Sequence, residues 1–472
     1  MSEPARSSHS PAAMPAEFGV ATATFIVVAS MVGVGVLTTS GFTVAGLKSN
    51  ELMLWLWLLG GIVAACGALT LCELTAALPK TGGDYVYLRE AYGPLVAFLS
   101  GWVSFLIGFA APTAAAAFGA SKYLTSPWNL GLAIESNVQR GLATLLIGGF
   151  ALIHLSGRRR TAHVQAWITA IKLLILFGFV LSGLVIGWPR HANLFDRPPI
   201  TTPVFSEMMF SLVYISYAYL GWNSASYLAG EFKNPQKQLP RAILLGTFGV
   251  IVLYLGLNLV FALALSPDEI QAIVNDPSNT RAFKPEAVAP IAEIAAKRLF
   301  GARISEPFSF AIGLMLLSSL SAYVLTGPRV IYAMAVARQF PSVAGRLSPR
   351  TGTPAVATAL QVTASLALLW TGSFESLVIY ASVGLSIFSM LAVGAIFVLR
   401  VKQPNLVRPF RTPGYPVTPA LYLLPTLGLT LAAFSQRPLI STYALLSILA
   451  GVPFYFLQKR ASGRRSDSDT PL

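Results

Sequence analysis

Charged side chains are scarce in this sequence of 472 residues, where Asp, Glu, Lys and Arg together make up 11%. Soluble domains carry about 25% of these residues. Hydrophobic residues make up 54% of the chain, and its mean hydropathy is +0.65. Apolar stretches of about 20 residues, long enough to cross a bilayer, recur along the sequence. These features exclude an ordinary soluble domain and predict an all-α integral membrane protein.

Cysteine is nearly absent as well. The two cysteines, Cys66 and Cys72, fall inside one apolar stretch, so no disulfide framework is predicted. The sequence contains no zinc-hydrolase, nucleophile-elbow or P-loop pattern. It therefore argues against an enzyme, and it predicts neither a metal site nor a cofactor.

Acidic residues are outnumbered by basic ones, which gives a formal net charge of +14. The basic residues lie mostly in short loops, and one side of the predicted topology carries more of them than the other. Cytoplasmic loops are enriched in Lys and Arg, so this asymmetry predicts that both termini are cytoplasmic. The basic excess therefore requires no nucleic-acid partner.

Twelve stretches are predicted to be membrane spans. They cover residues 17–45, 52–78, 95–120, 141–155, 162–188, 203–240, 242–265, 308–335, 355–370, 377–399, 419–434 and 442–457. Residues 79–94 are expected to form an inner loop, and the apolar spacing at residues 286–300 predicts a helix on the outer surface. Glu73, Glu207 and Glu231 lie near span ends, where we expect them to be solvated.

Two of these spans contain residues that weaken a helix in mid-membrane. Residues 217–225 combine aromatic, polar and glycine residues, and Gly33 and Gly35 stand two apart in the first span. Such residues are tolerated where the backbone lines a wet cavity. The alternatives are a polar contact between intact helices and close packing of small residues. Because the two spans enter from opposite sides of the membrane, interruptions at matching places favour a transporter site.

An α-amino acid is the ligand that two such interruptions would suit. Free amide groups near Gly35, at the start of an outer half-helix, would attract a carboxylate. Carbonyl groups left free near Met31, Tyr217 and Leu220 would attract an ammonium group.

Lys172 lies about 15 Å into the fifth span at 1.5 Å per residue, which is roughly halfway across the apolar core. Placing a lysine at that depth costs about 2.5 kcal/mol or more, so its side chain is expected to face the bundle interior. One interpretation is that it merely bonds helix-end carbonyls. The other is that it is a fixed cation joining the first and fifth spans where a sodium ion would otherwise bind.

Four segments resemble one family of transporters. The string YAYLGWNSASYLAGEFKNPQKQLPRAI is similar to the sixth-helix signature of the amino acid–polyamine–organocation (APC) transporters, especially their L-type amino acid transporter branch. Three other strings resemble further parts of the same family: CELTAALPKTGGDYVYLREAYGPLVAFLSGW, LTGPRVIYAMA and RPFRTPGYPVTP. The resemblance covers most of the chain and implies a five-plus-five inverted repeat with broken helices 1 and 6.

The resemblance implies a division of the chain. Residues 17–200 would be the first repeat with spans 1–5, and residues 201–401 the second repeat with spans 6–10. Residues 1–16 are rich in Ser, Pro and Ala, which itself predicts a disordered cytoplasmic tail. Residues 402–458 would hold spans 11 and 12 with the preceding cytoplasmic loop, and residues 459–472 a second cytoplasmic tail.

The resemblance also assigns roles to residues. The family's G-S-G break falls on Gly33, Val34 and Gly35, whose amides would hold the substrate carboxylate although Val34 lacks the serine hydroxyl. The carbonyls for the ammonium group fall on Met31, Tyr217 and Leu220. Lys172 matches the fifth-helix lysine of sodium-independent members, and Tyr254 matches a seventh-helix tyrosine proposed to contact it.

Departures from the family pattern bear on the substrate. Leu220 stands where members that take large neutral substrates have glycine, which implies a smaller side-chain pocket. Asn223 stands where cationic-substrate antiporters carry glutamate, so a cationic substrate would lose a counter-ion. Residues 122–140 contain no cysteine, so no disulfide-linked heavy chain is expected.

The sequence therefore predicts a sodium-independent transporter of small or medium neutral amino acids in the plasma membrane, working by exchange or proton-coupled uptake. In a Gram-negative cell this would be the inner membrane. Its expected partners are the lipid bilayer and a small-molecule amino acid. Two alternatives remain open, which are a cationic amino acid or polyamine antiporter, and an amino-acid-sensing receptor or channel on the same fold.

Overall fold

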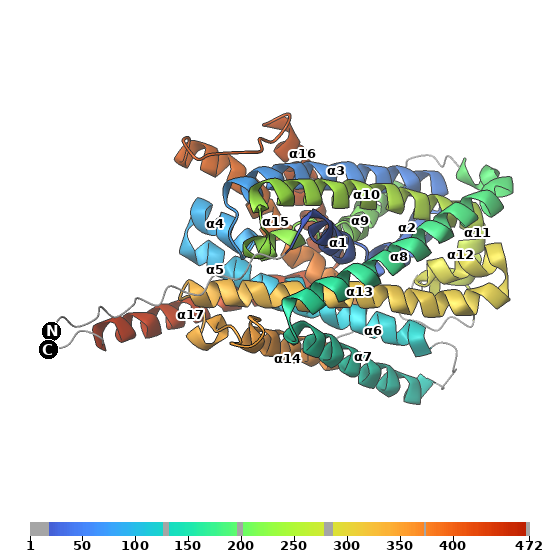
Figure 1. The fold of residues 1–472 in the computed structure, drawn as a ribbon. Coiled ribbons are helices and arrows are strands. Elements are labelled where there is room, and N and C mark those ends of the chain that lie inside the picture. The colour runs from blue at the N-terminus through green and yellow to red at the C-terminus, as the bar shows by residue number, and fades with distance from the viewer. Residues whose placement is uncertain (1–17, 126–131, 196–201, 278–286, 372–373, 469–472) are drawn as a thin grey trace, which may run out of the picture.

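The computed structural model describes residues 18–125, 132–195, 202–277, 287–371 and 374–468, and they form a bundle of helices (Figure 1). Helices are expected in a chain this apolar, because a bilayer offers the backbone no other hydrogen-bond partner. The α-helices are α1 Val20–Met31, α2 Val34–Leu47, α3 Asn50–Ala77, α4 Asp84–Tyr92, α5 Pro94–Val103, α6 Ala111–Thr125, α7 Leu132–Leu155, α8 Arg158–Gly187, α9 Thr202–Ala218, α10 Pro235–Ala264, α11 Pro267–Val274, α12 Ile291–Phe300, α13 Ala302–Val336, α14 Ala355–Thr371, α15 Phe374–Lys402, α16 Val417–Gln436 and α17 Pro438–Ser468.

Shorter helical segments of other types join these helices. They are the π-helix Ser104–Ala110 between α5 and α6, and the 3-10 helices Trp188–Leu194, Ser224–Glu231 (η4) and Ser342–Gly345.

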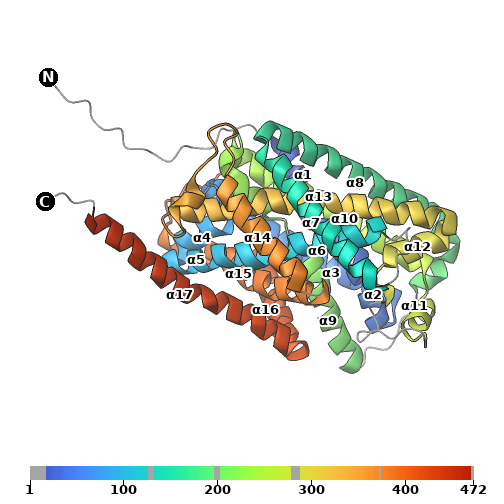
Figure 2. The same ribbon diagram turned by 90° about the horizontal axis from the view of Figure 1, so that it is seen from below.

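Helix α1 lies in the middle of the bundle in Figure 1 and contacts α8, α10 and α13. The short helix α4 lies at one end of the bundle, and α11 and α12 lie at the opposite end (Figure 1). Helix α17 runs along the outside and projects beyond the other helices (Figure 2). The interior is therefore built around α1, the first half of an interrupted span.

Ten helical stretches of the described chain are long and apolar enough to cross a membrane, and one of them, Val20–Leu47, comprises α1, α2 and the break between them. A multi-pass membrane protein is therefore confirmed. The other two predicted spans are the sixth, which is interrupted, and the ninth, where α14 is a shorter apolar helix of residues Ala355–Thr371. The count of twelve spans therefore stays a prediction.

Several predicted boundaries differ from the observed ones. The predicted sixth span at 203–240 is helical in α9 only as far as Ala218, and the next long helix, α10, begins at Pro235. The predicted inner loop at 79–94 contains α4, and α17 continues to Ser468, well into the predicted tail. The surface helix predicted at 286–300 corresponds to α12, Ile291–Phe300.

Two acidic residues expected to be solvated are buried in ion pairs instead. Glu73 on α3 receives two hydrogen bonds from the guanidinium of Arg400, at 2.7 and 3.0 Å. Glu231, at the end of η4, pairs with the buried Arg329 of α13 at 3.0 Å. Burying a carboxylate costs free energy, which a buried ion pair can offset. Because the arginine partners are distant in sequence, the sequence alone does not reveal these pairs. Glu207 is exposed, as expected.

Candidate functional site

The first span is interrupted in its middle. Helix α1 ends at Met31 and α2 begins at Val34, while Val32 (φ −78°, ψ 85°) and Gly33 (φ −117°, ψ −152°) leave the helical conformation. No side chain caps the start of α2. The first amides of a helix have no partner within the helix, so this buried start offers free N–H groups and a positive dipole end.

The sixth span is interrupted at the same level. Helix α9 ends at Ala218 and the 3-10 helix η4 begins at Ser224. Gly221 has φ +112°, and a Cβ atom added to it would lie 2.8 Å from the carbonyl oxygen of Ser30. A Cβ on Gly35 would lie 2.9 Å from the Cα of Ala218. Glycine is therefore required at both positions, because the two interrupted segments press against each other.

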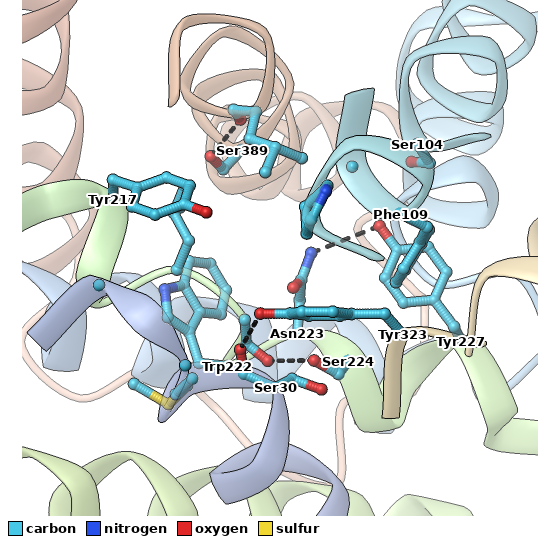
Figure 3. Close-up of a pocket in the computed structure, with 18 of the residues that line it drawn as sticks. Ser30, Ser104, Phe109, Tyr217, Trp222, Asn223, Ser224, Tyr227, Tyr323 and Ser389 are labelled. Atoms are coloured by element: carbon cyan, nitrogen blue, oxygen red, sulfur yellow. Dashed lines mark hydrogen bonds between the residues drawn. The ribbon is translucent and has the colours of Figure 1, made fainter. Parts of the chain in front are cut away.

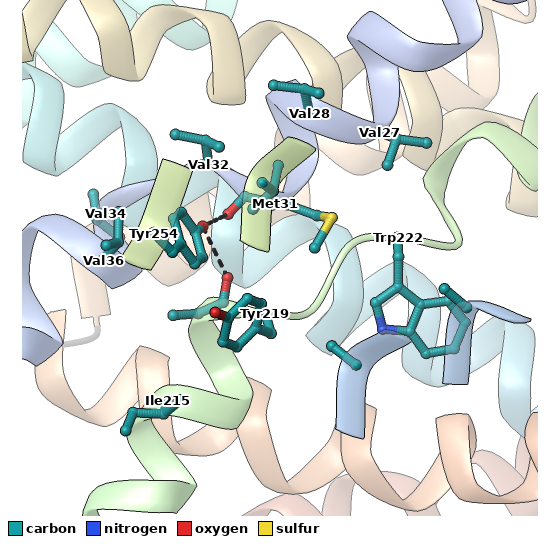
Figure 4. Packing of buried hydrophobic residues seen from close by; sticks show 14 of the residues in the cluster. Val27, Val28, Met31, Val32, Val34, Val36, Ile215, Tyr219, Trp222 and Tyr254 are labelled. Atoms are coloured by element: carbon teal, nitrogen blue, oxygen red, sulfur yellow. Dashed lines mark hydrogen bonds between the residues drawn. The ribbon is translucent and has the colours of Figure 1, made fainter. Parts of the chain in front are cut away.

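The hydroxyl of Tyr254, on α10, joins the two breaks. It lies 2.6 Å from the carbonyl oxygen of Met31 and 3.0 Å from that of Ala218 (Figure 4). These carbonyls end α1 and α9, so one tyrosine can donate to the last turn of either half-helix. Its ring packs against Trp57 and Tyr219, with centroids 5.4 and 5.1 Å away.

A cavity of about 70 Å³ lies between the two breaks (Figure 3). Its lining includes the ends of α1, α2 and α9 together with residues of α4, the π-helix, α13 and α15. All seven residues predicted to bind substrate line it: Met31, Gly33, Val34, Gly35, Tyr217, Leu220 and Asn223. The structure thus places these seven residues around one cavity, as we predicted from the sequence, whereas their roles in binding stay a prediction.

The helix ends around the cavity determine what it can bind. Helix α2 begins there, whereas α1 and α9 end there. A helix N-terminus favours an anion and a C-terminus favours a cation. The cavity is therefore suited to a small zwitterion. In the described part of the chain, no group of three His, Cys, Asp or Glu residues is placed to hold a metal ion.

Two of the carbonyls expected to be free have partners in this conformation. The Met31 carbonyl accepts the amide of Gly33 at 2.9 Å in addition to the hydroxyl of Tyr254. The Tyr217 carbonyl accepts the amide of Leu220 at 3.1 Å. An ammonium group would therefore share these oxygens with their present donors.

Lys172 is buried, with 1% of its surface exposed, and points from α8 to the first break. Its Nζ donates to the carbonyl oxygen of Val32 at 2.5 Å and to the Oγ of Ser319, on α13, at 2.8 Å. Its ammonium therefore occupies a position among oxygen atoms that would suit a small cation.

The hydrogen bonds of Lys172 and Tyr254 in the described structure go to other groups, so the contact between them that the resemblance implies stays a prediction. The two side chains engage consecutive carbonyls of the same break, Val32 and Met31. The two residues hold the break from different helices, and neither lines the cavity itself.

Asn223 and Asp84 form a polar contact that the sequence did not reveal. The Nδ2 of Asn223 donates to the Oδ2 of Asp84 at 2.7 Å, and the hydroxyl of Tyr227 donates to the same oxygen at 3.1 Å. Asp84 begins α4, in the segment predicted to be a loop, yet it is buried and lines the cavity. The GGD string gave no sign of this burial.

The π-helix Ser104–Ala110 was also missed, and its Ser104, Gly108 and Phe109 line the cavity. Proline has no N–H, so Pro112 cannot bond the carbonyl of Gly108 four residues earlier. This proline was a signal in the sequence for irregular winding, which often accompanies functional sites.

Comparison with known proteins agrees with this architecture. A family model for amino acid permeases matches residues 18–458. The serine/threonine exchanger SteT of Bacillus subtilis (strain 168) is 30% identical over 451 residues, which cover 94% of this chain and 97% of that protein. The large neutral amino acids transporter small subunit 2 of Mus musculus is 28% identical, with 94% and 81% coverage. The b(0,+)-type amino acid transporter 1 of Homo sapiens is 28% identical, with 93% and 87% coverage.

A membrane-embedded cavity between two interrupted helices is the arrangement of a secondary transporter. The chain belongs to the amino acid permease family.

Proposed function

We propose that this protein exchanges small neutral amino acids across a membrane by alternating access. The observation that carries this proposal is the uncapped N-terminus of α2 at Gly33, facing the same cavity as the C-terminal ends of α1 and α9. An α-carboxylate would bind the amides of Val34 and Gly35, and that of Gly33 once it leaves the Met31 carbonyl, while an α-ammonium would bind the carbonyl ends. A related protein, SteT, is named as a serine/threonine exchanger, which supports exchange over uptake.

Sodium independence is part of the proposal. The ammonium of Lys172 already donates hydrogen bonds to the Val32 carbonyl and the Ser319 hydroxyl, so it takes the place that a sodium ion would need among these oxygens. The equivalence of the two halves, residues 17–200 and 201–401, is also proposed, because each begins with an interrupted helix.

The substrate side chain would occupy the part of the cavity lined by Leu220 and the rings of Phe109, Trp222 and Phe388. Leu220 narrows this part, so small side chains are favoured over large aromatic ones. We place the protein in the plasma membrane with both termini in the cytoplasm, acting as a transporter and not as an enzyme.

We also propose that it works without a disulfide-linked heavy chain. The mouse relative is named a small subunit, but the only cysteines of this chain, Cys66 and Cys72, are buried within α3. Neither thiol can reach a partner protein.

The proposal is tested by purifying the protein, reconstituting it into liposomes and loading these with one unlabelled amino acid. Uptake of labelled alanine or serine is then measured with each of the twenty amino acids inside. We expect small neutral amino acids inside to accelerate uptake and empty vesicles to show little. Equal uptake into empty and loaded vesicles would contradict exchange, and acceleration by arginine or putrescine alone would show a cationic antiporter.

A further inference from the structure

Asp84 is the one residue with a formal charge at neutral pH among the described residues that line the cavity. Only 5% of its surface is exposed. Its Oδ2 accepts hydrogen bonds from Asn223 and Tyr227, at 2.7 and 3.1 Å, and these fix the orientation of the carboxyl group. The fixed side chain is an unusual feature in a site for neutral ligands, because a buried charge is costly unless it is fully bonded.

The second oxygen of this carboxyl group, Oδ1, is buried and has no hydrogen-bond partner in the described structure. An ionised carboxylate accepts several donors, and leaving one oxygen without any is unfavourable. Burial accordingly raises the pKa of Asp84 to about 6, and the bonds from Asn223 and Tyr227 offset this only in part. One more donor at Oδ1 would complete the site.

The position of Asp84 in the cavity indicates which part of a bound substrate could supply this hydrogen-bond donor. The groups suited to the amino acid backbone come from α1, α2 and α9, whereas Asp84 faces the cavity from α4. Once a substrate's carboxylate and ammonium are bound at the helix ends, its side chain is the part left to reach α4. Figure 3 shows Asn223 and Tyr227, the two partners of Asp84, within the same pocket.

We propose that Oδ1 of Asp84 accepts a hydrogen bond from a donor on the substrate side chain, either a hydroxyl group or a cationic nitrogen. The inference rests on the proposed function. A hydroxyl donor would narrow the substrates to hydroxyl-bearing neutral amino acids, and a cationic donor would extend them beyond the neutral class. The sequence argument that a cationic substrate would lose its counter-ion at Asn223 also needs correction. Asn223 donates a hydrogen bond to Asp84, whose carboxylate can serve as that counter-ion. Asp84 thereby becomes a residue that determines specificity.

Pairs of amino acids of similar shape test this inference. Threonine and valine differ in one hydroxyl group, as do serine and 2-aminobutyrate, and lysine and norleucine differ in the cationic nitrogen. Competition with labelled alanine exchange gives the preference within each pair. A hydrogen bond to a charged group increases the affinity for a ligand by about tenfold to a hundredfold. In at least one pair, we expect the amino acid that bears the donor to compete about tenfold better than its partner. A response of the threonine or serine pair would identify hydroxyl-bearing substrates, and a response of the lysine pair cationic ones.

The variant Asp84→Asn keeps an acceptor oxygen for Asn223 and Tyr227 but presents an amide NH₂ group in place of Oδ1. We expect the tenfold preference to disappear or reverse. Asp268→Asn, at an exposed position on α11, is the matched control and should leave the preference unchanged. An equal loss of competition by every amino acid would instead assign Asp84 to the α-ammonium group and overturn the inference, as would an unaltered preference.

The wild-type protein provides a second measurement, in case the variant does not fold. The titratable groups that interact with Asp84 are tyrosines, namely Tyr87 on its own helix, Tyr227 on η4 and Tyr422 on α16. These tyrosines are already protonated at pH 7.5, so acidification to pH 5 changes the protonation state of Asp84 alone among the four groups, and the preference should fall several-fold. A preference independent of pH would contradict the inference. Absence of any alanine exchange would contradict the proposed function itself, so the two failures can be told apart.

Discussion

The ammonium of Lys172 and the hydroxyl of Ser319 lie 2.8 Å apart and meet at the same carbonyl oxygen, that of Val32 in the first break. Three helices, α1, α8 and α13, are thereby joined at one point beside the cavity. A charge held in this way stabilises one arrangement of the broken helix, so Lys172 is placed to influence the alternation between conformations.

Replacing Lys172 with Met should reduce exchange about tenfold or more. The change removes a charge-assisted hydrogen bond, worth about 1.5–3 kcal/mol, and leaves the buried Val32 carbonyl with one donor fewer. Exchange is measured in liposomes with sodium chloride or choline chloride outside. Lys237→Met, at an exposed position, is the control and should retain wild-type rates. Strict sodium dependence of the wild-type protein would contradict the role given to Lys172.

Replacing Tyr254 with Phe should cost about 1 kcal/mol of stability and slow exchange several-fold. The ring keeps its contacts with Trp57 and Tyr219, whereas the bond to Met31 or Ala218 is lost. Thermal unfolding in detergent and exchange rates measure the two effects.

Tyr443→Phe is the control for this change, because Tyr443 is 54% exposed on α17. If both tyrosine variants behaved alike, the bridge between the two breaks would have no function.

Replacing Gly221 with Ala should abolish exchange and lower the unfolding temperature. The residue has a positive φ, and its new Cβ would lie within 3.0 Å of Ser30 and Met31 backbone atoms. Gly249→Ala on α10 is the matched control, since nothing lies within 4 Å of its added Cβ. That variant is expected to be stabilised by up to about 1 kcal/mol. Wild-type exchange by the Gly221 variant would show that the two breaks need not approach so closely.

Replacing Arg329 with Met should destabilise the protein by about 3 kcal/mol or more, because Glu231 would be left buried without this partner. A double variant with Glu231→Leu should recover most of the loss, since no charge then remains at this position. Thermal unfolding of the single and double variants in detergent checks this. Equal destabilisation by both would show that packing, and not the ion pair, determines the effect.

Stability should depend on pH through Asp84, whose pKa is raised by burial from 3.8 to about 6. The native state then holds this proton more tightly than the unfolded state, so stability from this group falls as the pH rises from 4 to 6. On going from pH 7.5 to 5, the free energy of unfolding of the wild-type protein should rise by about 1 kcal/mol relative to that of Asp84→Asn. The difference in unfolding temperature between the two proteins at each pH measures this. A constant difference would mean that Asp84 does not titrate in this range.

The positions of the cavity residues could be predicted because their signals are local. Glycine and polar residues interrupt an otherwise apolar span at Gly33, Gly35 and 217–225, and a membrane tolerates such interruptions in few places. Lys172 was predictable for a similar reason, since a lysine at mid-span depth must face the interior.

The residues that the sequence did not reveal depend on tertiary contacts. Asp84 is buried where the start of α4 meets Asn223 and Tyr227, which lie some 140 positions further along the chain. Glu73 is buried against Arg400, and 327 positions separate them. Nothing in the local sequence of either acidic residue distinguishes a solvated side chain from a buried one.

The central claim is that the ends of α1, α2 and α9 together bind a zwitterion. The most direct measurement is competition with labelled L-alanine exchange in liposomes by L-alanine, L-alaninamide and propionate. The last two compounds lack the carboxylate and the ammonium group respectively. We predict that only L-alanine competes in the concentration range of its own transport, with each analogue weaker by at least about tenfold. Competition by either analogue at the same concentration as L-alanine would contradict the account.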